Sequence, residues 1–161
     1  MEAAMPKTES KVTFAAHLIL RYESYILVMR RHNTPEYNYW YALPMGSVEK
    51  YEVNCPILAL AREVENELSI GINPAYTRFV HAMFRPNHNE AGDRVDFFFE
   101  SHQWEGTIIN KEPEKYSHIA WCDAAQFPLN VVHHVKEALE QIKKGRTYSA
   151  FGPEHFSNLK Y

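Results

Sequence analysis

The chain has 161 residues, of which 45% are hydrophobic and 23% are charged, and this composition is typical of one globular domain with a buried core. Its formal net charge of −3 gives no basic surface of the kind that binds a nucleic acid polymer. No apolar run is long enough to cross a bilayer and no signal-peptide pattern is visible, so we expect no membrane partner. The two cysteines have no C-x-x-C spacing, which argues against a zinc site or a disulfide framework and favours a cytoplasmic protein.

In chain order, the predicted elements are strands interrupted by two helices. We expect residues 1–10 to be a disordered tail, 11–152 a single domain, and 153–161 a second tail. Apolar runs and turn residues predict strands over 12–20, 25–30, 40–43, 78–85, 94–100 and 119–122. One helix is predicted from Pro56, and a second over 130–144, where Gly145 ends the apolar period. This order predicts an α/β fold with a mixed sheet between helices, an α/β/α layer arrangement.

The first predicted helix carries acid on one face. Glu63, Asn66 and Glu67 stand at positions i, i+3 and i+4, so they point the same way and form a cluster of oxygen ligands. Mg²⁺ and Mn²⁺ prefer such ligands. An acidic face also occurs on many solvated helices that bind nothing, and the loop before the helix is what favours the metal site.

Residues 43–70 resemble the Nudix box, the signature of the MutT-like pyrophosphohydrolases. In that pattern a glycine is followed, after five residues, by a glutamate, and Gly46 and Glu52 have this spacing. An Arg-Glu-apolar-x-Glu-Glu run follows, and Arg62, Glu63 and Glu67 fall on its arginine, its first glutamate and its last glutamate. The resemblance implies the Nudix fold and an enzyme that hydrolyses phosphoanhydride bonds.

The chain departs from this pattern in three places. Nine residues rather than seven separate Glu52 from Arg62, and the two extra residues fall before the helix. Asn66 replaces the first residue of the Glu-Glu pair, and Ser69 replaces the closing glycine. Because Asn66 removes one negative charge, we expect weaker metal binding or one metal ion fewer.

The resemblance also implies roles for the residues of the box. The backbone carbonyl of Gly46 and the side chains of Glu63 and Glu67 would hold Mg²⁺ or Mn²⁺, and Asn66 would offer a carbonyl oxygen. Either glutamate could activate the attacking water, and the choice between them stays open.

Two further roles concern residues around this helix. Arg62 would pair with Glu52 and brace the loop against the helix, although such a pair can also be a surface contact of little energetic weight. Many relatives add an acid from the loop before the last strand, where Glu112 is our candidate for a further metal ligand and Glu114 is a second one. An ordinary solvated loop is an equal alternative there.

Substrate recognition is predicted from residues outside the box. Arg30 and Arg85 suit phosphate oxygens because a guanidinium can donate two parallel hydrogen bonds. Tyr39 and Trp40 could stack on a nucleobase, although aromatic residues at a strand entry more often serve packing. The two histidines at 133–134 open a helix and are expected to be solvent-exposed.

These features together predict a divalent-metal-dependent pyrophosphohydrolase. Its substrate would be a small nucleotide, either a nucleoside triphosphate or a nucleoside diphosphate linked to another group. The alternative is a Nudix domain that binds a nucleotide without turning it over, as a sensor or regulator, and Asn66 and Ser69 favour that alternative. The oligomeric state stays open, with a homodimer as one choice.

Overall fold

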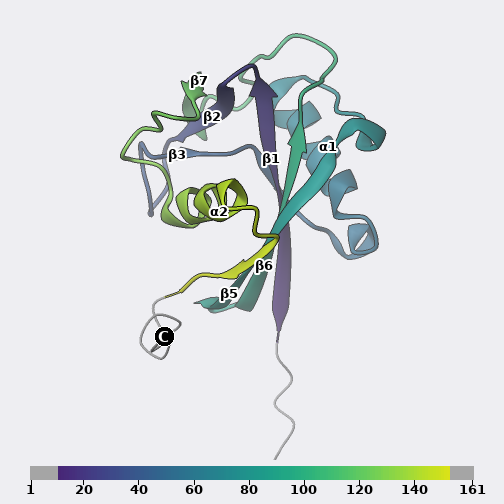
Figure 1. Ribbon diagram of the computed structural model, residues 1–161, viewed down its shortest axis with the longest axis vertical. Coiled ribbons are helices and arrows are strands. Elements are labelled where there is room, and N and C mark those ends of the chain that lie inside the picture. Colours follow the sequence, from purple (N-terminus) through teal and green to yellow (C-terminus); the bar gives the residue numbers. More distant parts are fainter. Residues whose placement is uncertain (1–10, 153–161) are drawn as a thin grey trace, which may run out of the picture.

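The computed structural model describes residues 11–152, and the two predicted tails lie outside them (Figure 1). The strands are β1 (Val12–Tyr22), β2 (Tyr25–Arg31), β3 (Tyr41–Ala42), β4 (Met45–Ser47), β5 (Arg78–Asn89), β6 (Gly92–Ser101), β7 (Tyr116–Asp123) and β8 (Tyr148–Ala150). The helices are α1 (Pro56–Leu68) and α2 (His133–Lys143), with two short 3₁₀ turns, η1 (Lys50–Glu52) and η2 (Pro74–Tyr76). No helix of the described range is long and apolar enough to span a membrane.

The strands form one mixed sheet in the order β3-β2-β1-β6-β5-β8, with β4 added beside β1 and β7 beside β2. β1 runs parallel to β6 along nine residue pairs and antiparallel to β2 and β4. β5 pairs antiparallel with β6 and parallel with β8. The predicted mixed sheet is therefore confirmed.

The side chains of β1 alternate between two cores, one for each helix. Ala16, Leu18 and Leu20 are fully buried in the core that includes α1, whereas Ile19 is buried in the core that includes α2. Figure 1 shows the two helices on either side of β1. Because successive side chains of a strand point to opposite faces, one buried strand can hold a helix on each side of the sheet. The predicted α/β/α arrangement is confirmed.

Helix α1 begins and ends as its sequence predicts. Pro56 is its first residue, directly after Cys55, and its missing N–H costs no hydrogen bond at that position. The apolar face buries Ile57, Leu60, Val64 and Leu68. Ser69 ends the helix in the left-handed conformation, with φ of 60°, and donates its backbone N–H to the carbonyl of Glu65 at 3.1 Å. A glycine adopts this conformation without steric cost, which explains why the Nudix pattern has one here.

The predicted boundaries were wrong chiefly at the second helix and at the hairpin, and β1 and β7 are also longer than predicted. The second helix begins at His133 rather than at residue 130, because Val131 and Val132 pair with Tyr41 beside the sheet: the Val132 N–H donates to the Tyr41 carbonyl at 2.9 Å. The hairpin between β5 and β6 is also tighter than predicted, since both strands continue to Asn89 and Gly92. Periodicity did not indicate the three-residue strands β4 and β8, whose pairing comes from distant partners.

The backbone at Ser69 gives a prediction about stability. Replacing Ser69 with glycine removes the Cβ that disfavours a left-handed residue, so we expect the variant to be more stable by about 1 kcal/mol. Urea denaturation measures the difference. Ser69→Ala is the matched control because it removes the hydroxyl but keeps the Cβ, and it should give no gain. Equal stability of the glycine and alanine variants would contradict the steric explanation.

Candidate functional site

An ion pair joins the loop before α1 to the helix itself. The Nε atom of Arg62 donates to one carboxylate oxygen of Glu52 at 2.8 Å and its Nη2 atom to the other at 3.1 Å. Nη2 also reaches the backbone carbonyl of Ser47 at 3.1 Å. Glu52 is only 3% exposed, and the hydrogen bond from Arg62 lowers its pKa. The pair is therefore a buried brace between loop and helix, with two parallel hydrogen bonds.

Gly46 lies where the strand β4 passes closest to α1. A Cβ at this position would clash with the Cγ of Glu63 and would lie 2.9 Å from the carbonyl oxygen of Ala59. No side chain fits in this space, so glycine is required for the approach of strand and helix. The contact places the backbone of β4 directly against Glu63.

Glu67 is the most perturbed acid of the helix. It is 4% exposed, and one of its oxygens accepts a hydrogen bond from the hydroxyl of Tyr116 at 3.1 Å. Its other oxygen, Oε2, has no hydrogen-bond partner among residues 11–152. Burial raises the pKa of Glu67 to about 7, against the hydrogen bond from Tyr116 and with a contribution from the charges of Glu112 and Glu63. A carboxylate in this state gains from a cation that can bind its free oxygen.

Glu112 comes close to Glu67 through the loop before β7. The backbone N–H of Lys111 donates to the carbonyl of Glu67 at 2.9 Å, which holds this loop against the end of α1. One oxygen of Glu112 accepts from Lys115 at 2.9 Å, and the other is buried without a partner in the described part of the chain. The structure therefore brings the predicted additional acid beside the helix.

The other two predicted metal-binding residues of α1 lie in different surroundings. Glu63 is half-buried and forms an ion pair with Arg62. Asn66 is exposed. Among residues 11–152, one group of three potential metal-ligating side chains has its ligand atoms within 4.8 Å of one another, and it contains none of these acids. The carboxylates of Glu63, Glu67 and Glu112 are therefore spaced more widely than that.

A cavity of about 390 Å³ lies on the α2 side of the sheet. Its lining is rich in cationic and aromatic side chains from β1, β2, the loop after β2, β5, β6 and α2, and includes His17, Arg31, Tyr37, Arg85, Arg94 and His134. Met45 also lines it, and Met45 is the neighbour of Gly46 in β4. Two successive residues of β4 thus connect the two regions, because Met45 lines the cavity and Gly46 lies against Glu63 of α1. A larger, more apolar cavity of about 570 Å³ beside α2 contains none of the predicted site residues.

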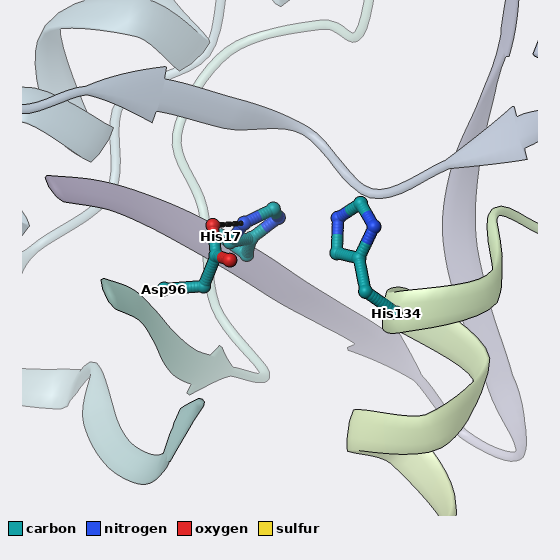
Figure 2. A group of neighbouring side chains, drawn as sticks. All are labelled: His17, Asp96 and His134. Carbon is teal, nitrogen blue, oxygen red and sulfur yellow. Dashed lines mark hydrogen bonds and ion pairs between the residues drawn. The ribbon is translucent and has the colours of Figure 1, made fainter. Parts of the chain in front are cut away.

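Arg85 belongs to a buried hydrogen-bond network in the smaller cavity. Its Nε atom donates to Asp96 at 2.6 Å, and Arg94 donates to the same carboxylate at 2.9 Å. His17 contacts Asp96 at 2.8 Å. Figure 2 shows His17 and Asp96 joined by this bond, with His134 of α2 across from them. Asp96 is fully buried, and its three partners compensate its charge.

The other three predicted substrate contacts lie outside the lining of this cavity. The guanidinium of Arg30 stacks over the ring of Tyr39 at 4.9 Å and donates to its backbone carbonyl. Trp40 packs against Tyr37 and His133 at the edge of the α2 core. The part of all four residues in substrate binding stays a prediction, and Arg85 is the one of them that lines the cavity.

Comparison with known proteins places this geometry in a family. The sequence model of the NUDIX domain matches residues 11–142, which include the loop, the helix and all but one of the residues that line the cavity. The chain belongs to the NUDIX domain family. No curated protein matches the chain in sequence.

Several solved NUDIX structures share the fold. A MutT NUDIX hydrolase from Burkholderia pseudomallei superposes with a TM-score of 0.71 at 22% identity, covering 81% of this chain and 97% of that one. A MutT protein from Methanosarcina mazei Go1 has a TM-score of 0.70 at 16% identity, with 85% and 96% covered. The NUDIX domain of Shewanella oneidensis NrtR, complexed with ADP ribose, has a TM-score of 0.61 at 16% identity, with 88% and 93% covered.

The residues of this NUDIX domain fit the divalent metal that the family implies. Glu67 and Glu112 each keep one buried carboxylate oxygen without a partner among the described residues, and hard cations bind such oxygens. Glu63 and the backbone of Gly46 lie in contact beside them. The donor set is all oxygen, which suits Mg²⁺ or Mn²⁺.

Sequence reasoning missed the network in the cavity. His17 and Asp96 each stand directly between apolar residues of a strand, and a polar residue at a buried strand position is a signal that something satisfies it. Arg94 gave no such signal. The expectation that both histidines at 133–134 are solvent-exposed was wrong for His134, which lines the cavity and shares a helix face with the buried Ala138, four residues on.

The raised pKa of Glu67 gives a prediction about the metal-free protein. Its folded pKa of about 7 lies above its ordinary value of 4.5, so its ionisation lowers stability as pH rises from about 4.5 to 7. Glu67→Gln removes this loss, and we expect it to stabilise the metal-free protein by about 2 kcal/mol at pH 8, with little effect near pH 4.5. Denaturant unfolding in chelator at both pH values measures this.

The control for this experiment is Glu65→Gln, because Glu65 is exposed on the same helix. It should change stability equally little at both pH values. A stabilisation by Glu67→Gln that is the same at pH 4.5 and pH 8 would show that burial of the charge is not its cause.

Proposed function

We propose that this NUDIX domain is a divalent-metal-dependent pyrophosphohydrolase. It cleaves a diphosphate linkage in a nucleoside triphosphate or in a nucleoside diphosphate linked to another group. The observation that carries the proposal is the pair of buried, unpartnered carboxylate oxygens of Glu67 and Glu112 beside Glu63. Desolvated acids gathered at one helix face destabilise the protein unless they bind a cation.

Glu63, Glu67, Glu112 and the carbonyl of Gly46 are the proposed metal ligands. When bound, Mg²⁺ or Mn²⁺ neutralises phosphate oxygens and lowers the pKa of a coordinated water. The chain's own part is to hold the acids in place. Tyr116 fixes one oxygen of Glu67, and the pair of Arg62 with Glu52 fixes the loop. Arg62 and Glu52 therefore position the site without contacting the substrate.

The rest of the substrate is proposed to occupy the cavity of about 390 Å³. Its volume lies in the range of small-molecule pockets, and Met45 joins its wall to the metal-binding side at Gly46. The cationic side chains around it suit an anionic substrate such as a nucleotide. A ligand of this class agrees with the ADP ribose bound by the NrtR domain.

A sensor without turnover is the second candidate function. Asn66 supports it, because an exposed neutral amide stands where the family pattern has an acid, and fewer charges weaken metal binding.

A cytoplasmic location and the absence of a nucleic acid polymer among the partners remain predictions. The free thiols of Cys55 and Cys122 agree with a reducing compartment.

A nucleotide panel separates the two functions. Nucleoside triphosphates, ADP ribose and other linked nucleoside diphosphates are incubated with Mg²⁺ or Mn²⁺, and the products are separated by ion-exchange chromatography. We expect at least one substrate to yield a nucleoside monophosphate, with a loss of at least about 100-fold in Glu67→Gln and full activity in Glu65→Gln. Binding that raises the melting temperature without any product would instead support the sensor.

The neutral residue at position 66 gives a prediction about metal affinity. Asn66→Glu adds a carboxylate on the face that carries Glu63 and Glu67. The added attraction between this carboxylate and the metal ion is about 1 kcal/mol, so we expect half-maximal activity at a Mg²⁺ concentration several-fold lower. Asn66→Gln is the matched control, since it lengthens the side chain without adding charge. An unchanged Mg²⁺ requirement in Asn66→Glu would place residue 66 away from the metal.

A further inference from the structure

The cavity contains a buried hydrogen-bonding atom for which the described residues provide no partner. This atom is Nδ1 of His17. His17 is 2% exposed, and its ring stacks on Phe98 with 4.6 Å between centroids. The ring is therefore held in one orientation, and Figure 2 shows its second nitrogen on the side of His134, which lines the cavity together with His17. Leaving such an atom unpaired is costly, so a bound group that pairs with it gains affinity.

The partners of His17 determine which hydrogen bond this nitrogen can make. Burial raises the pKa of Asp96, but His17, Arg94 and Arg85 hold it well below its usual range, so the carboxylate is charged. The Nε2 atom of His17 must then carry the hydrogen that it donates to Asp96 at 2.8 Å. Burial also lowers the pKa of His17, which keeps the ring neutral. Its Nδ1 is therefore an acceptor.

Charge argues against a cation in this cluster. His17, Asp96 and His134 have potential ligand atoms within 4.8 Å of one another (Figure 2). The carboxylate of Asp96, however, already accepts hydrogen bonds from His17, Arg85 and Arg94. Two guanidinium groups at hydrogen-bond distance from the same carboxylate repel a metal ion.

The same geometry argues against a phosphate or carboxylate placed directly on His17. An acceptor lone pair repels an anionic oxygen, which can only accept. The donors stand beside it instead. Arg85 lies 3.4 Å from Nδ1 of His134, and since a guanidinium can only donate, the hydrogen of the neutral His134 ring is on Nε2. The wall thus offers one acceptor flanked by donors.

We propose that His17 is a specificity-determining residue, whose Nδ1 accepts a hydrogen bond from an N–H of an uncharged substrate group while Arg85 and His134 donate to an acceptor beside it. A nucleobase edge has this pattern, because an N–H stands next to a carbonyl oxygen or a ring nitrogen. The proposal rests on the proposed function, since it names the part of the substrate that fills the cavity. Asp96 acts through His17 by fixing its tautomer.

The test uses nucleoside monophosphates, which contain no diphosphate to cleave, and methylated counterparts that lack the base N–H. The pairs are uridine and 3-methyluridine, inosine and 1-methylinosine, and adenosine and N6,N6-dimethyladenosine monophosphate. Calorimetry with Mg²⁺ measures their affinity for the full chain. We expect methylation to weaken the tightest ligand about tenfold, the equivalent of one buried hydrogen bond.

The same measurement in His17→Leu isolates the acceptor. Leucine fills much of the space of the ring but has no hydrogen-bonding atom, so the methylation penalty should fall to within about twofold. His17→Ala, which also removes bulk, should behave alike, and it serves if the leucine variant does not fold. His102→Leu is the matched control because His102 is exposed, at 63% of its side chain, and it should keep the full penalty.

Three results would overturn the proposal. The first is an equal methylation penalty in the wild type and in both His17 variants. The second is the absence of a methylation penalty in the wild type, which would mean that only water pairs with Nδ1 of His17. The third is the absence of binding by all three unmethylated ligands. Product release in the nucleotide panel is measured separately, so the hydrolase function can stand when the role of His17 fails.

Discussion

The antiparallel pairing of β1 with β4 is the contact on which both halves of the site depend. Ala16 pairs with Gly46 and His17 pairs with Met45. On one side of the sheet, Gly46 lies against Glu63 so closely that no side chain fits. On the other side, His17 and Met45 line the cavity. Because side chains alternate along a strand, two successive residue pairs serve two different chemical environments.

Electrostatics at the two sides are resolved in opposite ways. In the cavity, the charge of Asp96 is balanced by two arginines and a histidine, so this carboxylate is satisfied within the protein. Beside α1, Glu67 and Glu112 keep buried oxygens for which residues 11–152 provide no partner, and the pKa of Glu67 rises to about 7. Perturbed acids of this kind occur at functional sites, because a group prepared for an external cation is poorly solvated without one. We therefore place the chemistry on the α1 side of the sheet, where the carboxylates of Glu67 and Glu112 lie.

Much of the fold followed from local patterns. The helix that begins at Pro56 and the apolar strands β1, β2 and β6 were predicted, because periodicity and helix-start signals act within a few residues. Strands β4 and β8 were not, since their hydrogen bonds go to β1 and β5, far away in the chain. The start of α2 was misplaced because Val131 and Val132 bond to Tyr41, a contact that no local signal contains.

The sequence by itself determined the acidic face of α1, because spacing along one helix fixes which side chains share a face. The glycine before the helix and the pairing of Arg62 with Glu52 followed from the resemblance to the Nudix box. Only the tertiary structure decided that Glu67 is desolvated and that Glu112 lies beside it, since the Lys111 N–H ties a distant loop to the end of the helix. It also decided that His17, Asp96, Arg85 and His134 surround one cavity. Burial and charge compensation depend on neighbours from several elements, and a single stretch of sequence does not contain them.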